Sequence, residues 1–230
     1  MFGISIITCT HKEEYMDTIF NNYDRQTHYP KELILVLNNC DTDISKWENE
    51  ASKYLNVKVF KLEGKRAVGS CMNFAVEQAQ YDFVANFDHD DYYGTLYLTD
   101  YANVVNLVDA GLFGKRTHYA YLDESNTLTL RHPDMEYRYV DFVDGPTVFF
   151  KKAIFEKVKY IDSDFADCQL SFDCERNGIK VYSVNKENFC YIRRDNKSNH
   201  TWKIDDAEFL KRYCTILGKV DDFRHYVNLK

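Results

Sequence analysis

The stretch at residues 81–93, YDFVANFDHDDYY, decides the fold class. A short apolar and aromatic run, typical of a buried strand, ends in the carboxylates Asp88, Asp90 and Asp91. Carboxylates this close repel one another at neutral pH, and a divalent cation is their usual counter-charge. Because ligands bind at the carboxyl ends of strands in open α/β sheets, the stretch predicts a cation that holds an anionic ligand. A solvated acidic turn before the next helix is the alternative interpretation.

The segments on both sides of this stretch alternate between strand and helix patterns. Continuous apolar runs predict strands at residues 3–9, 32–37, 57–62 and 146–150. Helical spacing of apolar residues predicts helices at 13–25, 45–54, 68–79 and 97–108. Strands that are apolar throughout are typical of sheets covered on both faces. The sequence therefore predicts an α/β fold: a Rossmann-like, mostly parallel twisted sheet with helices on both faces.

The second half of the chain has less regular patterns. A hairpin is predicted around residues 124–126, and strands at 179–184 and 189–192. Helices are predicted at 165–176 and 205–214. A length of 230 residues suits one α/β domain, and no linker-like segment or repeat interrupts it. We therefore expect a single domain over residues 1–230, with residues 205–230 as a C-terminal helical extension.

Composition and charge narrow the classes of partner. The net charge of −7 argues against nucleic acid or an anionic membrane as the main partner. No apolar run approaches 18 residues, so no transmembrane segment is predicted, and peripheral membrane contact stays open. The N-terminus enters a strand pattern at once and lacks the features of a signal peptide. Seven scattered cysteines without a C-x-x-C pair suit free thiols, so we expect a cytoplasmic protein.

Polar residues follow several predicted strands and should meet at one edge of the sheet. These strand-end groups lie at residues 10–12, 38–39, 88–91 and 193–200. Lys65 and Arg66 precede a predicted helix, and helix N-termini favour phosphate. A cation site, basic side chains and a helix start together predict a pocket for a diphosphate. Taken alone, the Lys65–Arg66 pair is also typical of a solvated turn.

In this order, the motifs resemble the family-2 glycosyltransferases with the GT-A fold, over residues 4–204. The matching segments are ISIITCTH (4–11), LVLNN with DTD (35–43), GSCMN (69–73), FDHDD (87–91), FAD (165–167) and NHTW (199–202). FDHDD is similar to the D-x-D metal motif of the family. FAD stands where the family has its Glu-Asp motif at the acceptor, and NHTW resembles the histidine motif of a bacterial subgroup.

The resemblance implies an inverting transfer of a sugar from a nucleotide-sugar donor, a UDP-sugar, with Mn²⁺ or Mg²⁺ as cofactor. Asp90 would ligate the metal, and His200 would supply a second ligand. Asp88 would contact the donor ribose or a metal-bound water. Arg193 or Arg194 would assist on the diphosphate.

The resemblance also implies residues for the base of the donor and for proton transfer. Thr10 and His11 would lie in the nucleotide loop, with His11 near the base. Asn39 would face the uracil edge. Asp167 would be the general base that takes the acceptor proton.

Several positions depart from the family pattern. Cys9, His11 and Asn39 stand where Pro, Tyr and Asp are usual, which leaves the nucleoside open. Ala166 replaces the usual Glu, so Asp164 and Asp173 remain alternative bases. A packed structural histidine is the alternative for His200. The acceptor is not indicated, although the irregular, charged segment at residues 123–144 is predicted to shape the acceptor side.

Two other functions remain as alternatives. A sugar-phosphate nucleotidyltransferase would need a Gly-rich, Arg-containing loop after the first strand, and residues 8–12 contain no Gly. A non-catalytic nucleotide- or carbohydrate-binding module on the same fold is the other alternative, and Ala166 is its main support.

Overall fold

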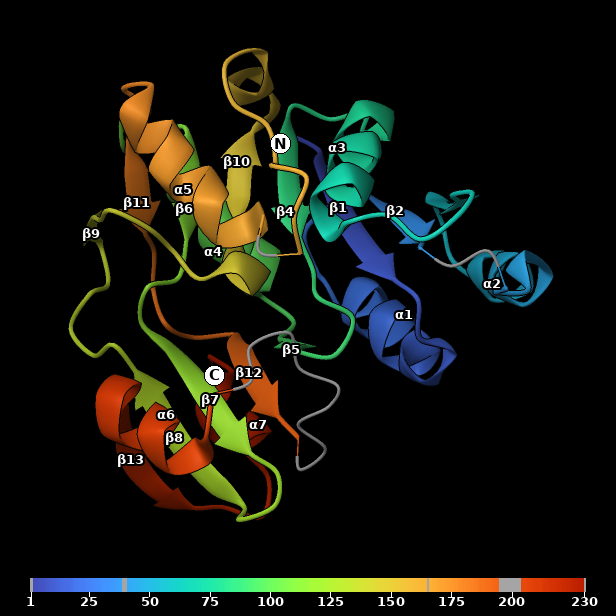
Figure 1. The fold of residues 1–230 in the computed structure, drawn as a ribbon. Coiled ribbons are helices and arrows are strands. Elements are labelled where there is room, and N and C mark those ends of the chain that lie inside the picture. The colour runs from blue at the N-terminus through green and yellow to red at the C-terminus, as the bar shows by residue number, and fades with distance from the viewer. Residues whose placement is uncertain (1, 39–40, 165, 195–203, 230) are drawn as a thin grey trace.

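The computed structural model describes residues 2–38, 41–164, 166–194 and 204–229, and the side chains of residues 167 and 168 lie outside it. Figure 1 shows a large sheet with helices above a smaller sheet. Within the described residues the large sheet has eight strands, which neighbour one another in the order β3 (Val57–Lys61), β2 (Lys31–Leu37), β1 (Ile4–Thr10), β4 (Phe83–Asn86), β10 (Phe149–Lys151), β6 (Leu112–Gly114), β11 (Val181–Ser183) and β9 (Arg138–Tyr139).

The large sheet is mostly parallel, as the apolar runs predict. The pairs β3–β2, β2–β1, β1–β4 and β6–β11 are parallel. β10 is antiparallel to β4 and β6, and β9 is antiparallel to β11. Both faces are buried: Ile4 and Ile6 of β1 pack in one core cluster, and Ile7 packs in the other. Burial on both faces explains why the strand sequences are apolar throughout.

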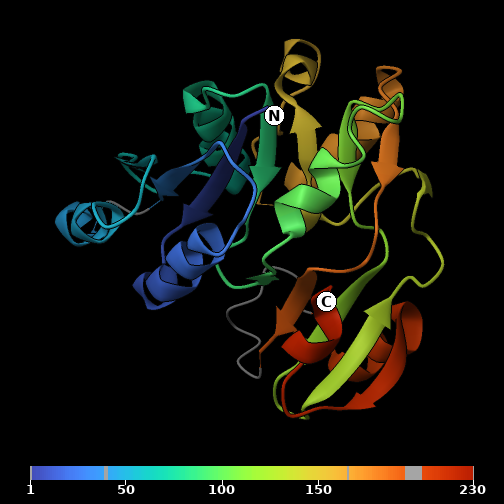
Figure 2. The same cartoon turned by 180° about the vertical axis from the view of Figure 1, so that it is seen from behind.

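Helices cover the two faces of the large sheet. α3 (Val68–Gln78) and α5 (Ala166–Arg176) lie on one face, as Figure 1 shows. α1 (Met16–Asp24), α2 (Ile44–Ala51) and α4 (Tyr97–Ala102) pack on the opposite face, which Figure 2 turns toward the viewer. α4 is shorter than the predicted helix at 97–108, because the following residues form turns. That segment holds Asn103, Val104, Val105 and Asn106, all of low helix propensity.

The small sheet is built mostly from the irregular second half of the chain, and β5 comes from the first half. Its strands in the described residues are β13 (Cys214–Lys219), β8 (Thr127–Arg131), β7 (His118–Leu122), β12 (Phe189–Arg193) and β5 (Tyr92–Tyr93). β7 and β8 form the predicted antiparallel hairpin. Alternate residues of β7 pack into two different small cores, because successive side chains of a strand point to opposite faces of the sheet. Tyr119 and Tyr121 pack with α7 (Arg224–Val227), and Ala120 and Leu122 pack with α6 (Asp206–Tyr213).

The C-terminal residues differ from the predicted helical extension. Residues 205–229 contain α6 and α7 with β13 between them. α6 begins as expected, because the Asp205 carboxylate accepts hydrogen bonds from the amides of Ala207 and Glu208. β13 pairs antiparallel with β8, and its β-branched Thr215 and Ile216 suit a strand. The prediction of an all-helical segment is therefore wrong.

Short 3-10 helices complete the chain: η1 (Glu13–Tyr15), η2 (Gly145–Thr147) and η3 (Lys152–Glu156). Across the described ranges, no helix combines the length and the apolar character needed to cross a bilayer. Five cysteines in these ranges carry free thiols, and Cys40 and the side chain of Cys168 lie outside them.

Candidate functional site

The acidic run lies at the edge of the large sheet that faces the small sheet. β1, β2 and β4 are parallel, so their carboxyl ends reach this edge together. The loops after β1 and β2 are joined there, since the Asn38 amide donates to the Thr10 carbonyl oxygen at 2.8 Å. After β4 the chain passes through residues 88–91 into β5 of the small sheet (Figure 1). The carboxylates therefore stand where the chain crosses from one sheet to the other.

Three carboxylates converge in this run. Asp88, Asp90 and Asp91 each offer an oxygen, and these oxygens all lie within 4.8 Å of one another. Asp91 is only 1% exposed, and its Oδ1 accepts a hydrogen bond from the Ile192 amide of β12 at 2.8 Å. Within the described structure its Oδ2 is buried without a hydrogen-bond partner. A buried, unpaired oxygen beside two further carboxylates is the donor set that a hard divalent cation prefers.

Burial and neighbouring like charges both act on the pKa of Asp91. Burial raises the pKa of Asp91 well above its usual range, and the charges of Asp90 and Asp88 raise it further. The Ile192 amide and the Arg194 guanidinium oppose this rise without cancelling it. A cation bound to the cluster would reverse the balance, because it stabilises the ionised form. The residues present therefore fit the predicted metal.

The backbone of the acidic run is fixed from the large-sheet side. The Asp88 amide donates to the Tyr93 hydroxyl at 2.7 Å, and that hydroxyl donates to the Pro146 carbonyl oxygen at 2.7 Å. Asn22 of α1 donates to the Asp91 carbonyl oxygen at 2.8 Å and accepts from the Tyr93 amide at 3.2 Å. Phe87 and Tyr93 stack with ring centroids 3.9 Å apart. These contacts hold the turn in one shape, so its carboxylates stay convergent.

Arg194 reaches the acidic run from the small sheet. Its Nη1 lies 3.3 Å from Asp90 Oδ2, and its Nη2 donates to the Asp90 carbonyl oxygen at 2.6 Å. The guanidinium carbon lies 4.8 Å from the ring centroid of Tyr15, which also contacts the ring of His89 at 4.8 Å. Arg194 therefore stands beside the predicted ligand Asp90, where a diphosphate would lie within reach of its fork.

The predicted nucleotide residues surround the same sheet edge. The Thr10 hydroxyl accepts from the Lys12 amide at 3.1 Å, so it closes its own loop. His11 is exposed, and its pKa is lowered by partial burial and by the nearby charges of Lys12 and Lys65. His11 and Lys65 thus lie near each other, although they belong to different loops.

Asn38 shapes the loop that carries Arg66. Its Nδ2 donates to the Arg66 carbonyl oxygen at 2.8 Å, and its Oδ1 accepts from the Arg66 amide at 2.9 Å. The Arg66 side chain remains exposed. Asn38 therefore ties the loop before α3 to the end of β2, which places Arg66 at the edge that carries the carboxylates.

The first backbone amides of α3 are hydrogen-bonded to other groups of the protein. The Val68 amide donates to Asp164 Oδ1 at 3.2 Å, and the Gly69 amide donates to the Ser163 carbonyl oxygen at 3.1 Å. Two amides expected to face a phosphate are therefore already bonded. A Cβ at position 69 would lie only 1.8 Å from the Ile161 carbonyl oxygen, so this close approach needs glycine. The amides of Val68 and Gly69 therefore already have partners, and the predicted contacts of Lys65 and Arg66 with a diphosphate stay predictions.

Ala166 lies in the same contact between α3 and α5. It is 1% exposed, and its Cβ would stand 2.8 Å from a Cβ added to Gly69. A glutamate side chain would not fit in this space. The packing of α5 on α3 therefore accounts for a small residue at position 166, and the role of Asp167 stays a prediction.

Three predicted site residues lie outside the described parts: Asn39, His200 and the side chain of Asp167. Their roles stay predictions. Of the two alternative bases, Asp164 accepts from the Val68 amide, and Asp173 accepts from Gln169 at 2.9 Å and Arg176 at 3.0 Å. Both carboxylates thus already have structural partners.

Sequence reasoning gave no role to several residues of the site. Asp91 was visible as the third carboxylate of the run, but its burial and its bond to β12 depend on the fold. Tyr15, Asn22 and Tyr93 come from segments with ordinary helix or strand patterns, so no local signal marks them. Spatial convergence alone identifies these side chains.

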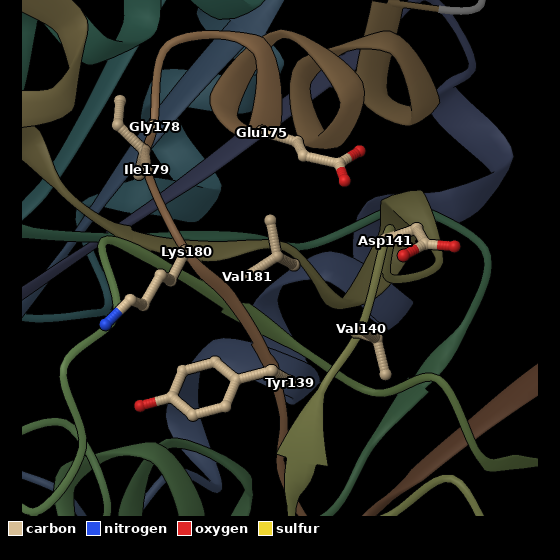
Figure 3. A pocket seen from close by; sticks show the side chains of 8 residues that line it. All are labelled: Tyr139, Val140, Asp141, Glu175, Gly178, Ile179, Lys180 and Val181. Carbon is tan, nitrogen blue, oxygen red and sulfur yellow. The ribbon is translucent and has the colours of Figure 1, made fainter.

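Away from the candidate site, a hollow of about 380 Å³ lies at the outer end of the large sheet between β9 and the end of α5 (Figure 3). Tyr139, Glu175 and Lys180 are among its lining residues. Lys180 covers the Tyr139 ring at 5.6 Å and is paired with Asp109 at 2.7 Å. None of its lining residues belongs to the strand-end groups, so the hollow is separate from the candidate site.

Comparisons with known proteins identify the family of this chain. The profile described as Glycosyl transferase family 2 matches residues 5–160. A search of the curated proteins gave no match. Among solved structures, TarS residues 1–349 from S. aureus in complex with UDP-GlcNAc is similar with a TM-score of 0.67 and 18% identity, covering 92% of this chain and 64% of that one.

A second similar structure is the mannosyltransferase PcManGT from Pyrobaculum calidifontis in complex with GDP-Man and Mn²⁺. It has a TM-score of 0.63 and 14% identity, covering 86% of this chain and 58% of that one. This chain spans less than two thirds of the length of either structure. At these identities the likeness shows the fold, which is GT-A as predicted. Because the family profile covers more than half of the sequence, the chain belongs to glycosyl transferase family 2.

Proposed function

We propose that the chain catalyses inverting transfer of a sugar from a UDP-sugar to an acceptor, with Mn²⁺ or Mg²⁺ bound at the strand-end carboxylates. The observation that carries this proposal is the convergence of Asp88, Asp90 and Asp91 at the sheet junction of a family-2 chain. The TarS structure with UDP-GlcNAc and the PcManGT structure with GDP-Man and Mn²⁺ support a nucleotide sugar and a divalent cation.

The carboxylates would hold the cation, and the cation would supply Lewis acidity to the departing diphosphate. Asp88, Asp90 and Asp91 offer converging oxygens for this. As predicted from the resemblance, His200 would add a further ligand. Arg194 carries a guanidinium at the same edge and would bind diphosphate oxygens. Positive charge on Arg194 stabilises the negative charge that develops when the sugar–phosphate bond breaks.

The acceptor would approach from the side of α5. Asp167 stands in the first turn of this helix and would take the acceptor proton as the new bond forms. A single displacement of this kind inverts the anomeric carbon, because the acceptor attacks opposite to the leaving group. We assign uridine on the resemblance of residues 35–43 to the family's uracil-side strand and turn, with His11 and Asn39 beside the base.

A panel of UDP- and GDP-sugars tests the proposal. Thermal unfolding of the wild type should shift upward with one UDP-sugar when Mn²⁺ is present, because a ligand that binds the folded state stabilises it. Asp90→Asn should abolish this shift and lower turnover by about 10²-fold or more. Asp82→Asn, an exposed carboxylate at the other end of β4, is the matched control and should behave as wild type.

The general base is tested separately. Asp167→Asn should leave the thermal shift by the donor intact while turnover falls by about 10²-fold. Retained turnover would remove Asp167 from the mechanism. Donor binding by the wild type without turnover on any acceptor would favour the non-catalytic module, and a shift by a GDP-sugar alone would overturn the assignment of uridine.

A further inference from the structure

We propose that Arg194 is an exchangeable counter-ion: it competes with the divalent cation for Asp90, and it transfers its charge to the diphosphate when the cation binds. This deepens the proposed function by assigning the order in which charges are exchanged at the site. It rests on that function only where a nucleoside diphosphate is used as a probe.

Arg194 contacts Asp90 at two groups, the side-chain carboxylate and the backbone carbonyl oxygen. One guanidinium nitrogen lies 3.3 Å from Asp90 Oδ2, and another donates to the Asp90 carbonyl oxygen at 2.6 Å. The Arg194 side chain is 26% exposed and the Asp90 side chain 17%, so water screens the pair less than it screens a surface ion pair. The pair therefore contributes to neutralising the acidic run.

A cation at the cluster would compete with the contact between Arg194 and Asp90. Asp90 Oδ2 belongs to the carboxylate whose oxygens converge with those of Asp88 and Asp91 within 4.8 Å. A divalent ion placed among them would stand close to the guanidinium, and like charges at such distances repel strongly. Arg194 must therefore release the Asp90 side chain, or the cation must bind weakly.

The structure also shows where the Arg194 guanidinium would remain after it releases Asp90. Its guanidinium carbon lies 4.8 Å from the Tyr15 ring centroid, so the ring face can keep the cation near the site without Asp90. The preceding residue is anchored: the Arg193 guanidinium pairs with Asp206 and lies 4.8 Å from the Phe209 ring centroid. An anchored neighbour would hold the backbone in place while the Arg194 side chain changes partners.

The exchange predicts that cation and diphosphate bind with positive coupling. The cation alone has to displace Arg194, which reduces its apparent affinity. A diphosphate gives the displaced guanidinium a new anionic partner, so each ligand favours the other by the same factor. Removing Arg194 should relieve the first cost and remove the second gain. The two effects have opposite signs, which a merely structural arginine would not produce.

Calorimetry with Mn²⁺ alone, and with Mn²⁺ plus UDP, tests the exchange. We expect Arg194→Ala to bind Mn²⁺ alone roughly fivefold more tightly than wild type, and to lose most of the UDP-induced rise in Mn²⁺ affinity. Arg194→Lys keeps the charge but loses the fork, so it should lie between the two. In an Asp90→Asn background, Arg194→Ala should raise residual Mn²⁺ affinity by less than it does in the wild type, because the competition for the Asp90 carboxylate is already gone and only repulsion between the two cations remains.

Two controls separate this result from others. Arg212→Ala removes an exposed arginine paired with Glu208 on α6 and should leave both affinities unchanged. Thermal unfolding with a chelator present shows whether each variant is folded, and Arg194→Lys replaces Arg194→Ala if the latter is not. Unchanged or weaker Mn²⁺ binding by folded variants overturns the exchange. Wild-type protein that binds Mn²⁺ but no UDP overturns the proposed function, while the Mn²⁺ arm still decides the exchange.

Discussion

Two buried carboxylates in this protein have opposite surroundings. Asp91 lies beside two further carboxylates, and burial, Asp90 and Asp88 raise its pKa well above the usual range. Asp144, in the loop before β10, lies among cations: Arg131 Nη1 is 2.9 Å from its Oδ1, and Arg116 Nη1 is 3.4 Å from its Oδ2. Burial alone would raise the pKa of Asp144, but the guanidinium of Arg131, followed by other nearby cations, holds it below its ordinary value.

The comparison separates a buried charge that other residues of the protein neutralise from one that they do not. The Asp144 cluster joins the two sheets, since Asp144 belongs to the large-sheet side and Arg131 to β8 of the small sheet. Its charge is satisfied internally, so its role is to hold the sheets together. The Asp91 cluster carries excess negative charge at the neighbouring junction, which the proposed cation would balance. In this molecule, the buried carboxylate that is paired with arginines supports the structure. The buried carboxylate beside like charges lies in the candidate site.

The largest expected effect is on the satisfied cluster. Asp144→Asn should lower the free energy of unfolding by about 3 kcal/mol or more, because it leaves the buried Arg131 charge without its partner. Chemical denaturation at pH 7 measures this change. Asp109→Asn makes the same substitution in the exposed pair with Lys180 and should have little effect. Equal stability of the two variants would remove the distinction between the clusters.

A smaller effect of opposite sign is expected at the unsatisfied cluster. With a chelator present, Asp91→Asn should raise the free energy of unfolding by about 1 kcal/mol, because it removes a buried charge beside like charges. The same variant should bind Mn²⁺ more weakly than wild type. Thermal unfolding and calorimetry measure the two quantities, with Asp82→Asn as the control. A destabilised Asp91→Asn variant would contradict the interpretation that this carboxylate is held at a cost.

A third expected effect is a change in the pH dependence of stability. Burial lowers the pKa of His118, beside Asp144, to about 3, whereas a histidine in the unfolded chain titrates near about 6.5. Between these values the unfolded chain binds more protons, so stability falls as the pH falls from 6.5 toward 3. Asp144 adds to this loss at lower pH, because its folded pKa is also depressed. Asp91 acts in the opposite direction, since its folded pKa is raised.

His118→Gln should therefore flatten the fall in stability between pH 7 and pH 5. Chemical denaturation at the two pH values measures the slope. His225→Gln, on the exposed α7 histidine, should leave the slope as it is in the wild type. A wild-type slope in His118→Gln would show that other groups govern the acid sensitivity.

The sequence predicted the half of the fold that depends on local pattern. The parallel core from β1 to β4, the hairpin of β7 and β8 and the cap at Asp205 each have a signal in adjacent residues. β5, β6 and β9 were missed, because each has only two or three residues and none lies within a longer apolar run. β10 and β11 are as short, but they overlap the predicted runs at 146–150 and 179–184. β13 was missed because its strand state depends on pairing with β8, which is distant in sequence.

The candidate site divides in the same way. The acidic run after β4 was visible, because three carboxylates after an apolar run are a local signal. The partners Tyr15, Asn22, Tyr93 and Ile192 were not visible, since each meets the run only through tertiary contacts. The hydrogen bond from the Val68 amide at the start of α3 to Asp164 was not visible for a related reason, since Asp164 lies nearly a hundred residues later.

β12 has a consequence for how this chain tolerates insertion. Ile192, Arg193 and Arg194 follow one another, yet their contacts go to Asp91, to α6 and to Asp90 in turn. Side chains alternate along a strand, so one extra residue in β12 would swap the destinations of the two arginines. α6 would then lose its anchor and Asp90 its partner in a single event. Length variation among related chains should therefore avoid this strand and accumulate beyond it.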